Sequence, residues 1–354
     1  MKKTKRPPLE SLACVNPECE VYGQTGVHNL VIRKEYGKHD RIRFMRCRLC
    51  REEFSERKNT ALWNCKIPEE KAVSVCEHLS EGVSFKGTAR LMRVDPGTVR
   101  RLNKRSGRHG EQYHEEKVQA IEVRNLQGDE RHGYAGSKAQ PSWEAELMDP
   151  ISKFVLSHVQ GPRNDALICR LLSDGASRLA DPHSIALFTD GDASYATHFP
   201  QFFGRPYQPA RQQTHGRPYN VRYRIPRSAA HVQVIKHRQG ARLQEIEIRY
   251  THGSRKRIRI ALEELGYQVP NTSAIERRNA TARMMSKAQV RKTLAFSKRS
   301  DEKLRLGWWS LTVYNWCRPH RSLRQDLPEP VGKKVCSTFT GHGHRPGRQD
   351  HDRG

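Results

Sequence analysis

The stretch "SIALFTDG", residues 184–191, is a short apolar run that stops at Asp190. Its length and its residue types are those of a strand buried on both faces. Upstream, "SWEAELMDP" (142–150) and "SKFVLSHVQG" (152–161) predict a hairpin, and "RNDALICRLLSDGASRLA" (163–180) has the apolar spacing of a helix. A hairpin, a helix and then a buried strand predict an α/β domain in which residues 184–191 form a parallel strand.

Asp190 is the first candidate for a chemical role. Ligands of open α/β sheets gather beyond the carboxyl ends of the strands, which is where this carboxylate should lie. An Asp-Gly turn accounts for the same dipeptide equally well. Asp129 and Glu130, in "LQGDERHGYAG", fall in what should be the first strand, but a surface turn fits that segment too.

Glu276, in "PNTSAIERRNATARMM" (270–285), allows two interpretations. Ser273 and Glu276 have the spacing of a capping box, in which the hydroxyl and the carboxylate each accept a hydrogen bond from an amide at the helix start. Yet Glu276 precedes 24 residues that contain eight Lys or Arg and no acid. We therefore expect a carboxylate that turns toward Asp190 when metal and DNA are bound, and that caps the helix without metal.

The remaining C-terminal half predicts further elements. "HVQVIKHRQGARLQEIEIRY" (231–250) alternates as a long hairpin that turns at residues 239–240. "ALEELGYQVP" (261–270) predicts a helix end and a short strand. The aromatic residues of "GWWSLTVYNWCRPHRSL" (307–323) have helical spacing, which favours a core over base stacking: Trp308, Trp309, Tyr314 and Trp316.

Composition indicates a polyanionic partner. The 354 residues include 64 Lys and Arg against 38 Asp and Glu, a formal net charge of +26. A hydrophobic content of 35% with five Trp supports a packed core and argues against a disordered chain. An anionic membrane would attract the same charge, but the sequence has no 18-residue apolar run and no secretion signal. Nucleic acid is therefore the expected partner, in a soluble, cytoplasmic protein.

The first four of the nine cysteines have metal-ligand spacing. Cys14 and Cys19 form one short pair and Cys47 and Cys50 form another, with a hairpin pattern around Gly37 between them. Four thiolates on two such turns would close a tetrahedron around structural Zn²⁺, as in a zinc ribbon. Four free thiols are the alternative. The other five cysteines lack paired spacing and are expected to be core or surface thiols.

Three short helices are expected next, at residues 68–82, 84–94 and 95–109. Glu69 and Glu70 open the first helix, and Asp95 caps the third. This layout is typical of a helix-turn-helix whose third helix enters the major groove. A helical bundle with a solvated basic face would look the same. "GRHG" (107–110) is expected to be a linker, and the expected DNA contacts lie on the third helix: Thr98, Arg100, Arg101 and Lys104.

With these segments in order, the chain resembles insertion-sequence transposases of the acidic-triad, ribonuclease H-like superfamily. It is most similar to the group of the first-described bacterial insertion sequence. The resemblance covers nearly everything from Cys14 to Leu323. It rests on seven segments in the expected order: "CVNPECEVYG", "RCRLCREEFSERKNT", "GDERHGYAG", "LFTDGDASY", "NTSAIERRNATARM", "QVRKTLAFSK" and "YNWCRPHRSL".

The resemblance implies an acidic triad of Asp129, Asp190 and Glu276 that binds Mg²⁺ or Mn²⁺ and transfers DNA strands. Carboxylates suit a hard cation, and two such ions assist in-line displacement at a phosphodiester. His132 stands where relatives usually have a large aromatic residue. Asp192 is an alternative to Asp190 as the second member of the triad. Basic residues of the Glu276 helix are expected to neutralise DNA phosphates: Arg277, Arg278 and Arg283.

The predicted architecture is multidomain. It comprises a zinc ribbon (1–60), a helix-turn-helix domain (61–110), an α/β ribonuclease H-like catalytic domain with a mixed central sheet and an inserted hairpin (111–335), and a disordered tail (336–354). The expected function is to bind the ends of an insertion sequence, free their 3′-hydroxyls and join them to target DNA. Pairing two ends of double-stranded DNA makes a homo-oligomer the expected active form, associated with a bacterial or archaeal nucleoid. The alternatives are a DNA-binding regulator or domesticated protein without strand transfer, and a nuclease that cuts without joining.

Overall fold

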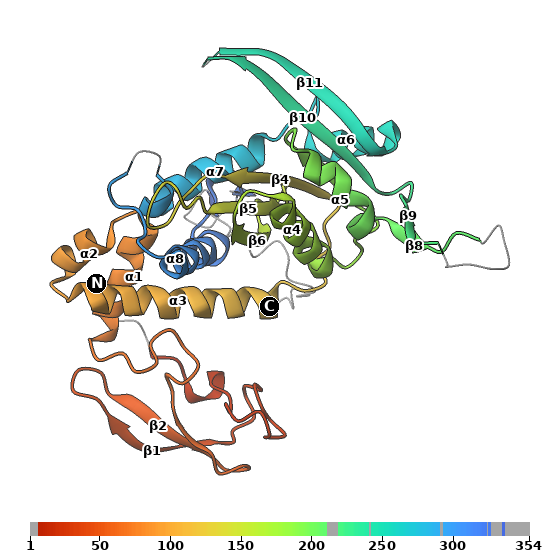
Figure 1. The fold of residues 1–354 in the computed structure, drawn as a ribbon. Coiled ribbons are helices and arrows are strands. Elements are labelled where there is room, and N and C mark those ends of the chain that lie inside the picture. Colours follow the sequence, from red (N-terminus) through yellow and green to blue (C-terminus); the bar gives the residue numbers. More distant parts are fainter. Residues whose placement is uncertain are drawn as a thin grey trace.

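A computed structural model describes residues 6–210, 219–240, 242–290 and 293–323, together with the backbone of residues 325–326 and 335–336. The predicted tail, 336–354, lies outside these residues except for the backbone of Cys336. Among the described residues, no helix combines the length and apolar character needed to cross a membrane. Figure 1 shows three successive regions: a small sheet, a group of helices and a large mixed α/β region.

The first region is a three-stranded antiparallel sheet, which we call the ribbon. Its strands are β1 (Leu30–Tyr36), β2 (Ile42–Cys47) and β3 (Glu53–Ser55), in the order β1-β2-β3. A short 3-10 helix, η1 (Leu9–Ser11), precedes them. The hairpin predicted around Gly37 is confirmed, because Tyr36 pairs with Ile42 across that turn. A small core of the four cysteines with Leu30, Met45 and Phe54 holds the ribbon together.

The second region contains the three predicted helices: α1 (Glu69–Ser80), α2 (Phe85–Met92) and α3 (Pro96–Lys117). Ser84 caps α2 by accepting from the Gly87 amide, and Asp95 caps α3 by accepting from the Gly97 amide. The apolar faces of the three helices meet in one core that includes Ala72, Val75, Leu79, Val99 and Leu102. The helical content of the prediction is therefore confirmed.

The predicted linker at residues 107–110 is wrong, because α3 continues through it to Lys117. Gly107 and Gly110 face α8 (Ser300–Thr312), where a Cβ atom at either position would collide with the Arg305 backbone or the Thr312 hydroxyl. The glycines thus permit two helices to pack closely. In Figure 1, α3 runs along the α/β region with α8 beside it, so one helix joins the second region to the third.

The third region is built on a six-stranded mixed sheet with the order β11-β10-β7-β4-β5-β6. β4, β7 and β10 are parallel, whereas β5, β6 and β11 are antiparallel to their neighbours. The parallel strand and both hairpins predicted from the sequence are confirmed. The strands are β4 (Asn125–Arg131), β5 (Trp143–Met148), β6 (Val155–Gly161), β7 (Ala186–Thr189), β10 (Ala230–Gln239) and β11 (Arg242–Gly253).

Helices cover both faces of this sheet. On β7, Leu187 packs into the core formed with α4 and α5, whereas Ala186 and Phe188 pack with α6. Every residue of β7 is fully buried, which explains its continuous apolar sequence. The helices are α4 (Asp165–Arg178), α5 (Ala193–Phe203), α6 (Arg255–Leu265) and α7 (Ser273–Met285). The region is therefore an α/β sandwich.

Shorter elements complete the fold. They are β8 (Arg205–Tyr207), β9 (Arg222–Arg224), η2 (Lys287–Gln289), the π-helical turn η3 (Val313–Cys317), η4 (Arg321–Leu323), β12 (Gln325–Asp326) and β13 (Val335–Cys336). The short strand expected after α6 is absent, because residues 267–270 form bends and coil. Trp308 and Tyr314 are buried and Trp309 and Trp316 pack against cores, which confirms that these aromatic residues are structural.

Candidate functional site

The two predicted aspartates meet at the carboxyl end of the central parallel strands. β4 and β7 pair with Asn125 opposite Ala186 and Gln127 opposite Phe188, and the same offset places Asp129 opposite Asp190. Glu130 joins them: the three residues can each offer a carboxylate oxygen, and these atoms lie within 4.8 Å of one another. We call Asp129, Glu130 and Asp190 the carboxylate cluster.

The alternation of β4 determines what supports Asp129. Gln127, Asp129 and Arg131 share one face of the strand and all contact the segment that forms α7. The Gln127 amide donates to the Asn271 carbonyl, and its oxygen accepts from the Ile275 amide at 3.0 Å. This fixes the start of α7 beside β4.

Asn279 then links Asp129 to the interior. Its side-chain amide donates to Asp129 Oδ2 at 2.8 Å, and its oxygen accepts from Arg131 at 3.0 Å. Asn279 lies one helical turn beyond Glu276, so both project from α7 on the same side. Asn279 was not predicted as a site residue, although its three-residue spacing from Glu276 is a signal for a shared helix face.

Glu130 faces the opposite side of the sheet. One oxygen accepts from Arg163 at 3.1 Å, and the other accepts from the Tyr195 hydroxyl at 3.2 Å. Arg163 also lies 3.6 Å from Asp192 and stacks over the ring of Trp143. Glu130 is therefore held beside Asp129 and Asp190 by partners from α5 and from the loop before α4.

Asp192, the predicted competitor of Asp190, has a local role in this structure. Its side chain accepts from the Ser194 amide and so caps α5. Asp190 instead lies at the strand end, where its carboxylate accepts from the Asp192 amide at 3.1 Å. The geometry places Asp190, and not Asp192, in the carboxylate cluster.

Burial and mutual repulsion make the cluster electrostatically strained. Burial, followed by the neighbouring Asp190 carboxylate, raises the pKa of Asp129 to about 6 and that of Glu130 to about 7. Burial also raises the pKa of Asp190. Nearby carboxylates shift one another in this way when no cation separates them. The donor set, all carboxylate oxygens, fits a hard divalent cation such as Mg²⁺.

Glu276 is not part of the cluster in this structure. Its carboxylate pairs with Lys236 of β10 and accepts from the Thr272 hydroxyl at 2.6 Å. The Glu276 charge still contributes to the raised pKa of both Asp129 and Asp190, so the carboxylate lies on the same side of the molecule as the cluster.

The predicted capping box is wrong. Thr272 is the cap residue, and Ser273 is the first residue of α7. The Ser273 amide and hydroxyl both donate to the Asn271 side chain, so they do not use Glu276. Glu276 is half-exposed, with 43% of its side-chain surface accessible, and its ion pair crosses from α7 to β10.

Beneath the cluster lies a buried network of charged groups. Glu144 binds Arg131 at 2.9 Å and Lys303 at 2.5 Å, and Glu146 binds Arg131 at 2.7 Å. Arg278 completes it at 3.1 Å from Glu146. The cationic partners outweigh the cost of burial and hold the pKa of Glu144 at about 2. The network fastens α7 and α8 to the sheet. Of its members only Arg278 was singled out from the sequence, and for a different role.

The structure overturns the predicted DNA contact of Arg278. This residue is only 2% exposed, and its guanidinium pairs with Glu146 and lies over the Tyr314 ring. The neighbouring Arg277 is exposed, as the prediction requires. Arg283 is half-buried and lines a cavity with Gly82 of the α1–α2 turn. On α3, Arg101 and Lys104 are exposed, Thr98 is half-buried, and Arg100 approaches Glu302 of α8.

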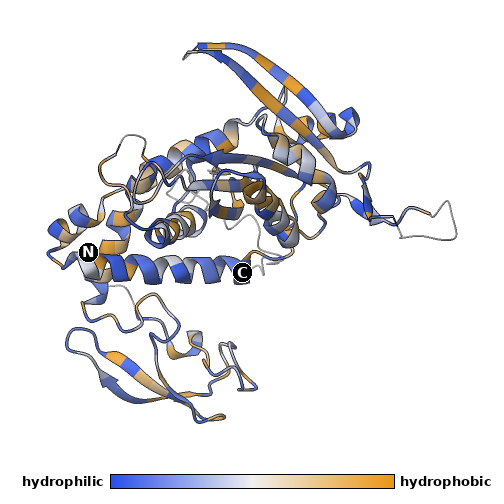
Figure 2. Cartoon of the chain, in the orientation of Figure 1, coloured by the Kyte–Doolittle hydropathy of each residue, from blue (hydrophilic) through white to orange (hydrophobic). Residues whose placement is uncertain are grey.

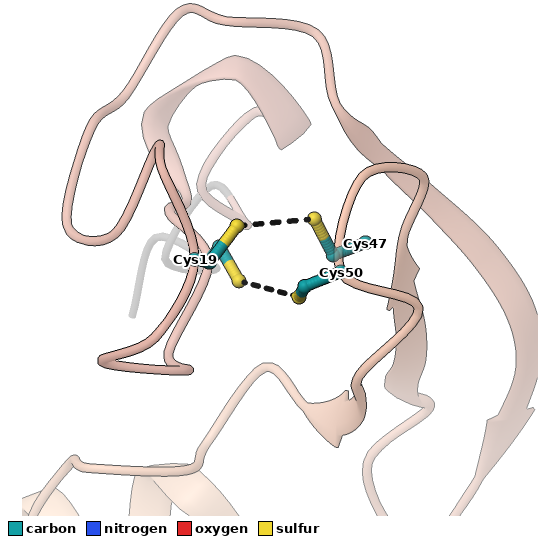
Figure 3. Close-up of side chains that lie close together, drawn as sticks. Cys19, Cys47 and Cys50 are labelled. Atoms are coloured by element: carbon teal, nitrogen blue, oxygen red, sulfur yellow. Dashed lines mark hydrogen bonds between the residues drawn. The ribbon is translucent and has the colours of Figure 1, made fainter.

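The four ribbon cysteines form the second candidate metal site. Cys14 Sγ lies 3.6 Å from Cys50 Sγ, and Cys19 Sγ lies 3.9 Å from Cys47 Sγ; Figure 3 shows this arrangement. Four sulfurs at the usual zinc–sulfur distance would be about 3.8 Å apart at the corners of a tetrahedron. The spacing therefore fits a Cys₄ zinc site.

Hydrogen bonds to the Cys47 sulfur favour its thiolate form. Burial opposes its ionisation, but backbone amides of Cys50 and Leu49 and the Asn29 side chain outweigh it and lower the pKa to about 7. Burial raises the pKa of Cys14 to about 12. The contacts of Cys47 therefore favour its thiolate form, which is the form that binds zinc.

Models of known protein families and curated proteins show no match to this chain.

Proposed function

We propose that the chain is a DNA transposase whose ribbon and helical region bind the ends of an insertion sequence. Its α/β region is ribonuclease H-like and cuts and joins DNA with the triad Asp129, Asp190 and Glu276. The observation that carries the proposal is the alignment of Asp129 with Asp190 at adjacent strand ends, with the helix that bears Glu276 fixed against the same strand through Gln127.

The protein would contribute to this reaction mainly by positioning charged groups around the phosphodiester. When bound, two divalent ions would activate the attacking oxygen and stabilise the leaving oxygen of the phosphodiester. Asp190 follows a fully buried strand, so its backbone is firmly placed, and its carboxylate would bind both ions. Asp129, oriented by Asn279, would bind one or both. Glu276 would complete one position after exchanging Lys236 for the cation.

The same residues serve two successive displacements. Water first cuts at the end of the element and leaves a 3′-hydroxyl, and that hydroxyl then attacks a phosphodiester of the target DNA. The oxygen that attacks becomes part of the new bond, and the displaced 3′-oxygen accepts a proton. No side chain forms a covalent bond with DNA, so a residue such as Tyr195 can remain buried in its contact with Glu130.

Charge also supports a DNA substrate. The net charge of +26 exceeds what solubility requires, and exposed cations lie on α3 and at the start of α7. Phosphate contacts by such residues supply affinity without sequence specificity. The ribbon and the three helices would provide the recognition of particular ends.

One observation favours a second candidate, a DNA-binding regulator without strand transfer. Glu276 is engaged by Lys236 and Thr272, so the triad is not closed in this structure. If that contact persisted on DNA, the α/β region would be catalytically inert and the N-terminal regions would carry the function.

The test is to incubate the purified protein with labelled duplexes of the flanking element ends, target plasmid and Mg²⁺. A transposase yields cleaved ends that become joined to the plasmid. Cleavage without joined products would indicate a nuclease. Binding without cleavage, in Mg²⁺ and in Mn²⁺, would leave the regulator.

A further inference from the structure

A cavity of about 650 Å³ separates the ribbon from α3. Tyr36 and Ile42 line it from the ribbon, Lys66 from the connection to α1, and Thr98, Arg101 and Arg105 from α3. In Figure 1 the ribbon and the remainder of the molecule lie on opposite sides of α3. We call this cavity the ribbon–α3 groove.

An internal clamp fixes the ribbon to α1, which packs against α3 in one core. Arg57, after the last ribbon strand, binds Asp40 of the ribbon hairpin at 2.7 Å and Glu69 of α1 at 2.8 Å. The Glu69 amide also donates to Asp40 at 3.0 Å. Arg57 is buried, and the two carboxylates neutralise its charge. The groove is thus preformed, which lowers the entropic cost of filling it.

The charge of the groove is positive. Lys66, Arg101 and Arg105 line it, and no Asp or Glu is found among its described lining residues. Lys66 and Arg105 form no ion pair within the described part of the chain, and Arg101 donates only to the neutral Thr98 hydroxyl. Figure 2 shows α3 coloured mainly as hydrophilic along its visible side. Three cations without counter-ions favour an anionic ligand.

Helical spacing selects which α3 residues reach the groove. Thr98, Arg101 and Arg105 follow one another at intervals of three and four, so they share one face. Arg100 belongs to another face and lies 3.3 Å from Glu302 of α8. The residues predicted together as DNA contacts are therefore divided between a groove face and a face that contacts the α/β region.

We propose that the ribbon–α3 groove binds the sugar–phosphate backbone of double-stranded DNA, with Lys66, Arg101 and Arg105 contacting successive phosphates. The ribbon and α3 then grip one duplex together instead of binding DNA as separate modules. This inference rests on the DNA-binding part of the proposed function, but it does not depend on catalysis. Lys66 and Arg105 become DNA contacts that helical propensity alone did not indicate.

The experiment measures binding of the full chain to a fluorescent 30-base-pair duplex without divalent ions, over a range of KCl concentrations. Each phosphate contact contributes about 0.9 to the slope of log affinity against log salt. Arg105→Ala and Lys66→Ala should each lower that slope by about 0.9 and weaken binding about five- to tenfold near 0.15 M salt. Arg105→Lys should restore most of the slope.

Lys117→Ala is the control, because Lys117 is an exposed cation of the same helix that lies on a different face and does not line the groove. It should change the slope by less than half as much. Zinc content and the unfolding midpoint confirm that each variant is folded. Wild-type slope and affinity in both Arg105→Ala and Lys66→Ala would overturn the proposal, as would equal loss in Lys117→Ala.

Two further outcomes separate this proposal from the proposed function. Competition by an acidic polypeptide as effective as competition by duplex DNA would overturn the assignment of the groove to DNA. Loss of binding in the groove variants together with no cleavage by wild-type protein would support the groove and defeat the transposase. Failure of the wild-type chain to bind any duplex would defeat both.

Discussion

The cysteine cluster of the ribbon and the carboxylate cluster of the sheet are assembled to different degrees in the same molecule. The four sulfurs already lie at the distances of a tetrahedral site. Of the proposed acidic triad, Asp129 and Asp190 lie together, whereas Glu276 is paired with Lys236. The ribbon ligands sit on two tight turns of one small unit. Glu276 lies near the start of α7, and that helix must pack correctly against the sheet before Glu276 can approach the ends of β4 and β7.

This difference has a physical cause. Thiols are weakly hydrated and pack as small hydrophobic groups, so the cysteines contribute to the ribbon core even without a cation. Three or four carboxylates repel one another when brought together without a cation. Pairing with Lys236 relieves that repulsion at Glu276. We infer that the cysteine site stabilises the ribbon fold, whereas the carboxylate site is completed only when the cation and DNA bind.

The largest expected effect is on the ribbon. Cys47→Ser removes the fully buried sulfur with the lowered pKa, and structural zinc contributes about 10–16 kcal/mol to the folding of small domains. The variant should contain no zinc by metal analysis and should lose binding to end DNA. Cys169→Ser on α4, outside both clusters, should retain both. A Cys47→Ser protein with full zinc content and full affinity would contradict the Cys₄ site.

The next prediction distinguishes a residue that stabilises the fold, Arg278, from a residue expected to contact DNA, Arg277. Arg278→Met leaves buried Glu146 without one partner and should lower the free energy of unfolding by about 3–5 kcal/mol. Arg277→Ala, at the exposed neighbour, should leave stability within about 0.5 kcal/mol and weaken DNA binding. Urea unfolding and fluorescence anisotropy measure the two quantities. The reverse pattern would return Arg278 to the DNA interface.

A smaller effect concerns acid sensitivity of the sheet region. Burial lowers the pKa of His231 to about 3 and that of His114 to about 4, so both are neutral in the fold and take up protons on unfolding. Stability should therefore fall as pH decreases from about 6.5 toward those values, by about 1.4 kcal/mol per pH unit for each His. Urea unfolding of wild type and His231→Gln at pH 7 and 5 tests this. An unchanged pH slope in the variant would contradict it.

The smallest effect tests the hold of Lys236 on Glu276. This ion pair is partly exposed, and such pairs contribute about 0–1 kcal/mol. Lys236→Ala should therefore lower the Mg²⁺ concentration for half-maximal cleavage by up to about fivefold. Lys256→Ala, at an exposed position of α6, is the control. An increase in the Mg²⁺ requirement would show that Lys236 assists the site instead of restraining Glu276.

Local patterns predicted the elements well where one physical rule dominated. The continuous apolar run of β7, the alternation of the β10–β11 hairpin and the Asp95 cap of α3 each follow from adjacent residues. The continuity of α3 through Gly107 did not, because glycine disfavours a helix unless tight packing against α8 requires it. That requirement arises from residues nearly 200 positions away.

The candidate site, like the fold, was predicted only in part from the sequence. Asp129 and Asp190 follow from strand ends, although the resemblance was needed to choose Asp129. The contacts of Asn279 and the burial of Arg278 depend on how α7 meets β4 and β5, which no local pattern encodes. The capping box failed because Thr272 and Asn271 offered competing hydrogen bonds to the same helix start.

The central claim is that DNA is cut at the carboxylate cluster, and Asp190 with its near neighbour Asp192 provides the most direct test. Asp190→Asn removes a cluster ligand, whereas Asp192→Asn keeps a good helix cap for α5. The measurement is the initial rate of Mg²⁺-dependent cleavage of end DNA at equal DNA occupancy. We predict a loss of more than about 10³-fold for Asp190→Asn and of less than about tenfold for Asp192→Asn. Cleavage that survives Asp190→Asn, or that is lost only in Asp192→Asn, would contradict the assignment.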